Sequence, residues 1–223
     1  MERLTVAIDG PAGAGKSSAA RLVAKRLGYL YIDTGAMYRA FTWAMLQEHI
    51  DIEDAEAVRA LTERVDIRLE PLEDKCRVFV GETEVTDAIR TQDISSRVSS
   101  VSALAVVREK LVQLQRNMAE GGGVILDGRD IGTVVLPKAD LKIFLTASVE
   151  SRARRRYLEV QAKGGAETLE DIAASIASRD DMDSHRAVSP LRQADDAILL
   201  DNSELNLEET ADAITDLIQQ RCR

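Results

Sequence analysis

The amino-acid sequence predicts an α/β fold in which helices cover both faces of a parallel sheet, giving three layers. Short apolar runs alternate with segments whose apolar residues recur at helical spacing, beginning with the run 4–8 and the helical pattern 16–27. This alternation is typical of βα units, whose strands pair in parallel. The chain has 223 residues, 45% of them hydrophobic, and can bury one substantial core. We therefore expect a single domain spanning 1–223.

The first half of the chain contains two such units and then a different pattern. The strand at 4–8 ends at a glycine-rich turn, and a second strand at 29–32 leads into a helix at 35–47. Between 66 and 86 the sequence reads DIRLE, CRVFV and TEV, separated by turn signals. Short alternating stretches between turns predict a small antiparallel insert outside the main sheet.

The second half of the chain returns to the first pattern. Three further strands are expected at 124–126, 141–145 and 197–200. Four further helices are expected at 100–119, 148–163, 168–183 and 207–218, the last with Asn206 as its N-cap.

Charge and composition exclude several classes of protein. The chain carries 38 acidic and 29 basic residues, a formal charge of −9, which disfavours a nucleic-acid or anionic-membrane partner. The N-terminal apolar run is too short for a signal peptide or a membrane span, so we expect a cytoplasmic protein. Cys76 and Cys222 are far apart and are expected to be reduced and structural. His49 and His185 are isolated, which disfavours a metal or triad role.

The first predicted turn carries a phosphate-binding signature. It reads GPAGAGKSS, which contains GxxxxGKS between a predicted strand and a predicted helix, as a P-loop requires. A glycine turn that merely caps a helix is disfavoured, because both flanking elements are in place. Backbone N–H groups would surround the phosphates, Lys16 would neutralise them, and the Ser17 hydroxyl would bind Mg²⁺. The predicted ATP-binding residues are Gly10, Pro11, Ala12, Gly13, Ala14, Gly15, Lys16, Ser17 and Ser18.

Two later strand ends carry further charged residues. The second strand is followed by DTGAMYRA, in which Arg39 either grips a second phosphate or is a solvated charge on a helix capped by Thr34. These two readings stay open on this segment alone. The strand at 124–126 runs into DGRDIGTVV, where Asp127, Arg129 and Asp130 form a charged cluster. A turn with merely solvated charges is the less favoured reading of that cluster.

The predicted helix at 148–163 is dense in arginine. Arg152 shares a helical face with Arg155 and Arg156, at spacings of three and four residues. This face either closes on the phosphates of ATP or is a solvated surface balanced by nearby glutamates. We select Arg152 and Arg156 as the pair that contacts ATP.

Four motifs in this order, GPAGAGKSS, DTGAMYR, DGRDIGTVV and RDDMDSHRAVSPL, resemble the bacterial cytidylate kinase family. The insert at 66–86 is similar to that family's enlarged lobe for nucleoside monophosphates (NMP), which the shorter adenylate kinases lack. The resemblance implies a three-layer P-loop NTPase fold with three functional regions. They are a core at about 1–33, 87–150 and 190–223, an NMP-binding region at about 34–100 and a short lid at about 151–186.

The resemblance also implies a role for each matching residue. Thr34 and Arg39 would hold the acceptor phosphate together with Arg129. Ser99, Arg108 and Asp130 would face the cytosine. Arg179, Asp183 and Arg186 would serve the sugar and the phosphates. The family often has serine where Thr34 stands, and threonine keeps the hydroxyl while adding a methyl group beside the phosphate. The implied catalytic group is Lys16, Arg39, Arg129, Arg152 and Arg156.

The chemistry of the nucleobase supports these roles independently. Cytosine presents an amino donor at position 4 and acceptors at N3 and O2, which a carboxylate and an arginine or hydroxyl complement. Uracil has a carbonyl at position 4, so Asp130 would repel it. Ser99 and Arg108 lie about two and a half turns apart near one predicted helix and could face one pocket. A general base is unnecessary, because the second pKa of a nucleotide phosphate is about 6.

The sequence thus predicts an enzyme that moves the γ-phosphoryl group of ATP, with Mg²⁺, onto CMP or dCMP. The nearest alternative is another small-molecule P-loop kinase. A P-loop switch would need a guanine-recognition motif such as NKxD, which the sequence lacks. A nucleic-acid-dependent ATPase is disfavoured by the acidic charge. We expect a monomer.

Overall fold

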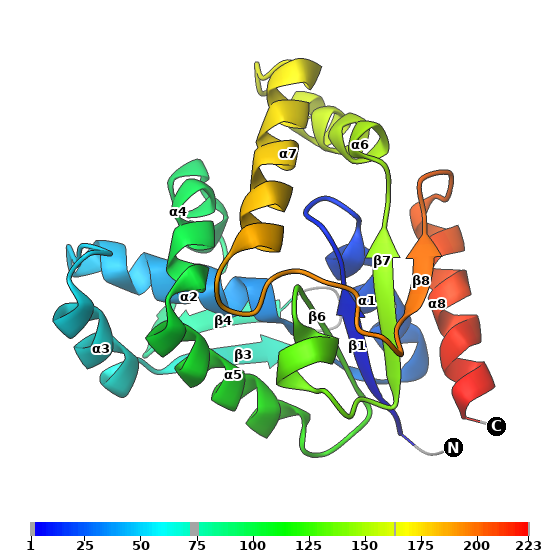
Figure 1. Cartoon of the computed structure of the whole chain (residues 1–223), viewed down its shortest axis with the longest axis horizontal. Coiled ribbons are helices and arrows are strands. Elements are labelled where there is room, and N and C mark those ends of the chain that lie inside the picture. Colours follow the sequence, from blue (N-terminus) through cyan, green and yellow to red (C-terminus); the bar gives the residue numbers. More distant parts are fainter. Residues whose placement is uncertain (1–2, 72–75, 163, 223) are drawn as a thin grey trace.

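The computed structural model describes residues 3–71, 76–162 and 164–222. Its centre is a parallel sheet whose strands follow the order β2-β6-β1-β7-β8 (Figure 1). These strands are β1 (Thr5–Asp9), β2 (Leu30–Asp33), β6 (Val124–Gly128), β7 (Leu141–Thr146) and β8 (Ile198–Asp201). Thr5 lies opposite Val124, and Val6 lies opposite Leu141, so β1 is the central strand. The five expected strands of the parallel sheet are confirmed.

Helices cover both faces of this sheet, as expected. Strand residues that alternate along the chain enter two different hydrophobic clusters, so that Val6 and Ile8 pack on one side and Ala7 on the other. The helices α1 (Lys16–Leu27) and α8 (Leu207–Arg221) complete the first cluster, which contains Val6 and Ile8. The helices α2 (Thr34–Gln47) and α5 (Ala105–Ala119) contribute to the second cluster, which contains Ala7. Such burial of both faces is the usual state of a parallel sheet. The three-layer α/β fold is confirmed.

The small insert is also confirmed. Three antiparallel strands form a separate sheet in the order β3-β4-β5. They are β3 (Ile67–Pro71), β4 (Cys76–Val80) and β5 (Thr83–Glu84). Ile67 and Val78 point into the second cluster of the main core, which anchors the insert to the body of the molecule. Before it lies α3 (Ala55–Arg64), a helix that the sequence analysis did not name.

The helix expected at 100–119 is wrong in its extent. The chain forms α4 (Gln92–Ala103), turns at Leu104 with extended backbone angles, and starts again as α5. No glycine or proline marks this turn, so the periodicity alone could not reveal it. The break between the two helices follows from tertiary packing, because α4 packs against α2 and α7 while α5 packs against α3. A short 3₁₀ turn, η1 (Ala88–Arg90), precedes α4.

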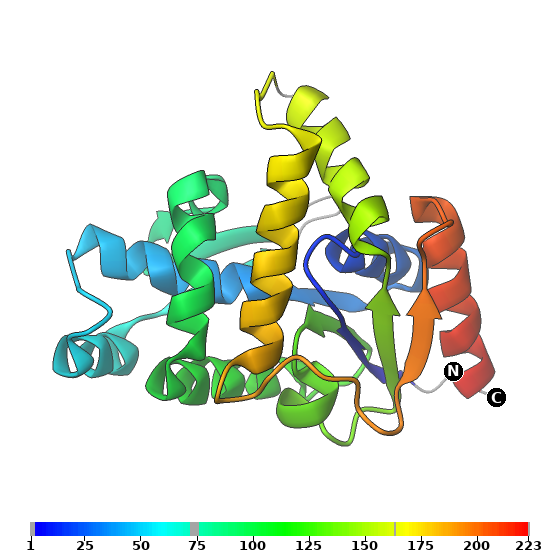
Figure 2. The ribbon, with the colours of Figure 1, turned by 45° about the horizontal axis from the view of Figure 1, so that its top comes forward.

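Two helices project beyond the sheet, lying side by side in both views (Figures 1 and 2). They are α6 (Val149–Ala162) and α7 (Leu169–His185), close to the expected ranges, although Lys163 lies outside the described residues. They share a small cluster of their own, which contains Ala153, Val160, Ile172 and Ile176. Across the described ranges, no helix has the length and apolar character that crossing a bilayer requires.

Candidate active site

The carboxyl ends of the parallel strands carry the polar residues of the motifs. Asp9 ends β1, Asp33 ends β2 and Asp127 lies near the end of β6, and all three are buried. These ends share one edge of the sheet, where open α/β sheets bind ligands. Asp33 caps α2 by accepting a hydrogen bond from Ala36 N–H at 2.9 Å. The reading in which Thr34 caps this helix is therefore wrong.

The glycine-rich loop between β1 and α1 has the geometry of a phosphate cradle. A Cβ atom on Gly10 would lie 1.9 Å from the carbonyl oxygen of Leu145, and Gly15 has a φ of 83° at the start of α1. Only glycine suits both positions. Gly15 has no side chain to cap the helix, so the first N–H groups of α1 remain available to an anion. Lys16 is buried beside them, with Nζ donating to Pro11 O at 2.7 Å.

Ser17 faces a carboxylate that the sequence analysis left out of its site list. The Ser17 hydroxyl donates to Asp127 Oδ2 at 2.8 Å, and Tyr31 donates to Asp127 Oδ1 at 2.7 Å. Burial, followed by repulsion from Asp33, raises the pKa of Asp127 to about 6. Hydroxyl and carboxylate oxygens suit Mg²⁺, which usually keeps several waters and binds one or two carboxylates plus substrate phosphates. Within the described ranges no cluster of three or more His, Cys, Asp or Glu residues could hold a metal, so nucleotide oxygens would have to complete this site.

A cluster of four cations, of which Lys16 is buried and the other three are partly buried, lies next to the loop. Arg39 Nε and Arg179 Nε are buried and lack hydrogen-bond partners among the described residues. Burial and the neighbouring Arg129 and Arg39 lower the pKa of Arg179 to about 10, which still leaves it charged at neutral pH. Burial, followed by Arg129, likewise lowers the pKa of Lys16. Among the ion pairs of the described residues, Arg129 pairs with Asp183 at 2.8 Å, and none joins Lys16, Arg39 or Arg179 to a carboxylate. An anion between these mutually repelling cations would be stabilised by their unused donors.

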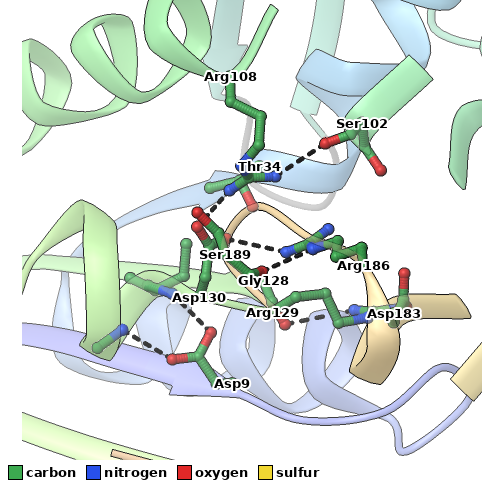
Figure 3. Close-up of polar contacts among 12 residues, drawn as sticks. Asp9, Thr34, Ser102, Arg108, Gly128, Arg129, Asp130, Asp183, Arg186 and Ser189 are labelled. Carbon is green, nitrogen blue, oxygen red and sulfur yellow. Dashed lines mark hydrogen bonds and ion pairs between the residues drawn. The ribbon is translucent and has the colours of Figure 1, made fainter. Parts of the chain in front are cut away.

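A second polar group lies beyond these cations (Figure 3). Asp130 forms a buried ion pair with Arg108, and Arg186 lies 3.7 Å from its other oxygen. Arg108 also donates to Ser102 O at 3.1 Å, and Arg186 donates to Ser189 O at 2.6 Å. The buried carboxylate is thus held in place by two arginines from different elements. It can accept a hydrogen bond from a ligand amino group on its remaining lone pairs.

Ser99 reaches this region from a different helix than the sequence suggested. It lies on α4, whereas Arg108 lies on α5, so the two residues do not share one helical face. Ser99 and Arg186 line a pocket of about 260 Å³ between α4 and α7. A pocket shared by Ser99 and Arg108 would therefore have to come from the packing of α4, α5 and α7 and not from one helical face. Thr34 is buried nearby and donates to Asp127 O at 2.7 Å.

Comparison with known proteins agrees with this geometry. The family model described as cytidylate kinase matches residues 6–220. A cytidylate kinase of Exiguobacterium sibiricum is 53% identical over 219 residues, covering 98% of this chain and 98% of that protein. A cytidylate kinase of Bacillus subtilis is 51% identical over 222 residues, covering 100% and 99% of the two chains. The chain belongs to the cytidylate kinase family.

More distant structures share the fold of this cytidylate kinase family member. A shikimate kinase from Bacteroides thetaiotaomicron has a TM-score of 0.50 and 12% sequence identity, covering 98% of this chain and 99% of that one. At that identity the likeness shows a common P-loop kinase fold and carries nothing about the substrate.

Three arginines of α6 in this family member occupy different environments. Arg152 is buried at the base of α6, where the helix leaves the sheet. Arg155 donates to Asn202 O at 2.5 Å, in the loop after β8. Arg156 lies one helical turn beyond Arg152, is half-exposed and pairs with Glu159 at 3.0 Å. Arg152 and Arg156 thus lie in different surroundings, and their joint contact with ATP stays a prediction.

Asp9 fastens the loop that carries Arg129 and Asp130. Its two carboxylate oxygens accept hydrogen bonds from the N–H groups of Ile131 and Gly132, each at 2.7 Å (Figure 3). These residues begin η2 (Ile131–Val135), a single wide turn directly after the charged motif. The end of β1 thus fixes where the charged side chains project.

The pH dependence of stability should reveal Asp9. Burial is the main reason why the pKa of Asp9 rises from 3.8 to about 6 in the folded protein. The folded state therefore holds this proton more tightly, and stability contributed by Asp9 is present below pH 4 and lost as the pH rises to 6. The difference in the free energy of unfolding between wild type and Asp9→Asn should fall by up to about 3 kcal/mol over this range. Urea unfolding of both proteins measures it, and a constant difference would contradict the assignment.

Three aspartates at the site are absent from the predicted site residues. The sequence analysis places Asp127 in the charged cluster after its strand but gives it no role, and Asp9 follows a buried apolar run in the same way, a signal that could have found it. Asp180 stands beside Arg179 in a charged helical segment, and nothing in the sequence distinguishes it from Asp181. Only the packing of α7 against the glycine-rich loop, where Ala12 N–H donates to Asp180 Oδ1 at 3.3 Å, brings it into the site.

Proposed function

We propose that this member of the cytidylate kinase family transfers the γ-phosphoryl group of ATP to CMP or dCMP, releasing ADP and CDP or dCDP. One observation carries the proposal, namely the four neighbouring cations Lys16, Arg39, Arg129 and Arg179, of which Lys16 is buried while Arg39 and Arg179 have buried Nε atoms without hydrogen-bond partners among the described residues. We infer that these cations bind the phosphates of the donor and of the acceptor nucleotide. Family membership and the names of the relatives support the same activity.

The donor half of the reaction uses the loop and the start of α1. Backbone N–H groups of the loop and the Lys16 ammonium would bind the β- and γ-phosphates of ATP. Ser17, with Asp127 behind it, would hold Mg²⁺, which supplies charge neutralisation to the phosphate oxygens when bound. Arg152 and Arg156 stay a prediction as lid contacts to ATP, as do the boundaries of core, NMP-binding region and lid.

The acceptor half uses residues from three other segments. Thr34, Arg39 and Arg129 would hold the phosphate of the acceptor nucleotide in line with the γ-phosphoryl group. Asp130, Arg108 and Ser99 would read the cytosine, and Arg179, Asp183 and Arg186 would bind the sugar and the phosphates. The acceptor oxygen is already anionic at neutral pH, because its pKa is about 6. The chain therefore accelerates the reaction by positioning and charge neutralisation alone.

The formal charge of −9 supports an enzyme without a nucleic-acid or anionic-membrane partner. We propose that the enzyme acts in the cytoplasm as a monomer.

A panel of acceptor nucleotides tests the proposed function. ADP release from ATP and Mg²⁺ would be followed with CMP, dCMP, UMP, AMP or GMP as acceptor. CMP and dCMP should give the highest kcat/KM, because only cytosine pairs an amino group at position 4 with the Asp130 carboxylate. A preference for AMP or GMP would contradict the proposal. Nucleotide hydrolysis that is independent of any acceptor would indicate a different P-loop activity.

A further inference from the structure

The backbone N–H and C=O of Ala12, in the middle of the glycine-rich loop, are both bound by residues of α6 and α7. Arg152 Nη1 donates to Ala12 O at 2.8 Å, and Ala12 N–H donates to Asp180 Oδ1 at 3.3 Å. The same guanidinium nitrogen donates to Asp180 Oδ2 at 2.6 Å. Arg152, Asp180 and the Ala12 backbone thus form one closed ring of hydrogen bonds between α6, α7 and the loop.

Arg152 has little freedom to leave this ring. Its side chain is 4% exposed, and its Nε donates to Ala147 O at 2.9 Å. A Cβ atom on Gly13 would lie 3.4 Å from the Arg152 Cβ, so the loop packs directly on the base of α6. The buried guanidinium already donates to three acceptors, so turning it to a phosphate would break hydrogen bonds for little gain.

The ring of hydrogen bonds affects ATP binding through the conformation of the loop. The Ala12 carbonyl and N–H both point to the lid, which leaves the N–H groups of the following residues to bind phosphate. Asn202 holds the loop from its other side, with Nδ2 donating to Ala14 O at 3.0 Å. An oriented set of donors binds an anion tightly only if its geometry is fixed beforehand.

We propose that Asp180 is a positioning residue for ATP. Together with Arg152, Asp180 fixes the backbone of Ala12 and thereby the phosphate-binding shape of the loop. Arg152 is then also a positioning residue, and its contribution passes through the loop backbone. The inference rests on the proposed function for its substrate, ATP, but its central measurement needs no acceptor nucleotide.

A double-mutant cycle tests the proposal. KM for ATP, KM for CMP and kcat would be measured for wild type, Asp180→Ala, Arg152→Met and the double variant. Each single variant should raise KM for ATP by about ten- to a hundredfold, the loss of one charged hydrogen bond, and leave KM for CMP nearly unchanged. KM for ATP in the double variant should not exceed that of the more affected single variant, because both residues act through the backbone of Ala12. Glu170→Ala removes an exposed acid from the same helix and should leave KM for ATP at the wild-type value.

Direct binding of ADP separates this inference from the proposed function. Calorimetric titration with ADP, in the absence of CMP, should show the same loss of affinity in Asp180→Ala and Arg152→Met. If Arg152→Met does not fold, Arg152→Lys keeps a donor and a charge at the same place and should show a smaller loss. Two outcomes would overturn the proposal. One is an Asp180→Ala protein that binds ADP as tightly as wild type, and the other is two single effects that multiply in the double variant.

Discussion

Replacing Lys16 with methionine should lower turnover by about two to four orders of magnitude while leaving the fold intact. Lys16 is buried at the start of α1, and its ammonium group is the cation nearest to the loop backbone. Methionine keeps the length of the side chain but cannot neutralise a developing phosphate charge. A loss of this size is expected when one preorganised charge contact is removed from a transition state. The measurement is kcat with saturating ATP and CMP.

A second buried lysine provides a matched control. Lys142 on β7 donates to Pro137 O at 2.7 Å, five residues away, just as Lys16 donates to Pro11 O. Its other partner, Asp196, lies in the connection before β8 and outside the site. Lys142→Met should lower the melting temperature but change the turnover of the folded enzyme by less than about tenfold. Wild-type turnover in Lys16→Met would contradict the phosphate-loop assignment.

Replacing Asp130 with asparagine should weaken the discrimination between CMP and UMP. In the proposed site the carboxylate would accept a hydrogen bond from the cytosine amino group and would repel the uracil carbonyl, whereas an amide can rotate to offer either an oxygen or an NH₂ group. Loss of a charged hydrogen bond and relief of an unpaired acceptor together amount to about 2 to 4 kcal/mol. The ratio of kcat/KM for CMP to that for UMP should therefore fall about thirty- to a thousandfold.

The structure adds a condition to this experiment. Asp130 also holds Arg108 in a buried ion pair, so the asparagine variant has to be shown to fold by thermal unfolding. Asp93→Asn is the matched control, because Asp93 pairs with Arg97 on the exposed surface of α4. It removes the same charge and should leave the CMP to UMP ratio unchanged. A folded Asp130→Asn protein with the wild-type ratio would place cytosine recognition elsewhere.

Local patterns were sufficient for the parallel sheet and for the residues at its edge. An apolar run followed by glycine and a basic helix start has few alternatives, which is why Lys16 and Ser17 could be placed from the sequence. Arg129 and Asp130 follow from the same logic, because the end of a buried strand is where charged residues need a ligand or a partner. A strand end therefore indicates where functional residues gather, although Asp9, which ends β1, is missing from the predicted site residues.

Features set by packing between distant segments could not be read in this way. The break at Leu104 has no glycine or proline, and it separates Ser99 from Arg108 because two helices follow different neighbours. Arg152 and Arg156 share a helical face, yet one is buried against the loop and the other lies near solvent. Helical spacing predicts which side chains are neighbours on a helix, but it does not predict how close each of them lies to the rest of the protein.

The strand order has a consequence for how the chain acquires its site during synthesis. Thr5 pairs with Val124 and Val6 with Leu141, so the strands that pair with the central strand β1 are synthesised much later than β1 itself. Contacts between residues this far apart in sequence are slow to form, since a long loop must close before any of them stabilises it. A nascent chain that ends before β6 has its glycine-rich loop but no strand paired with β1 to hold that loop in shape. Nucleotide binding can therefore begin only late in translation, and until then the apolar residues of β1 lie exposed to aggregation or to a chaperone.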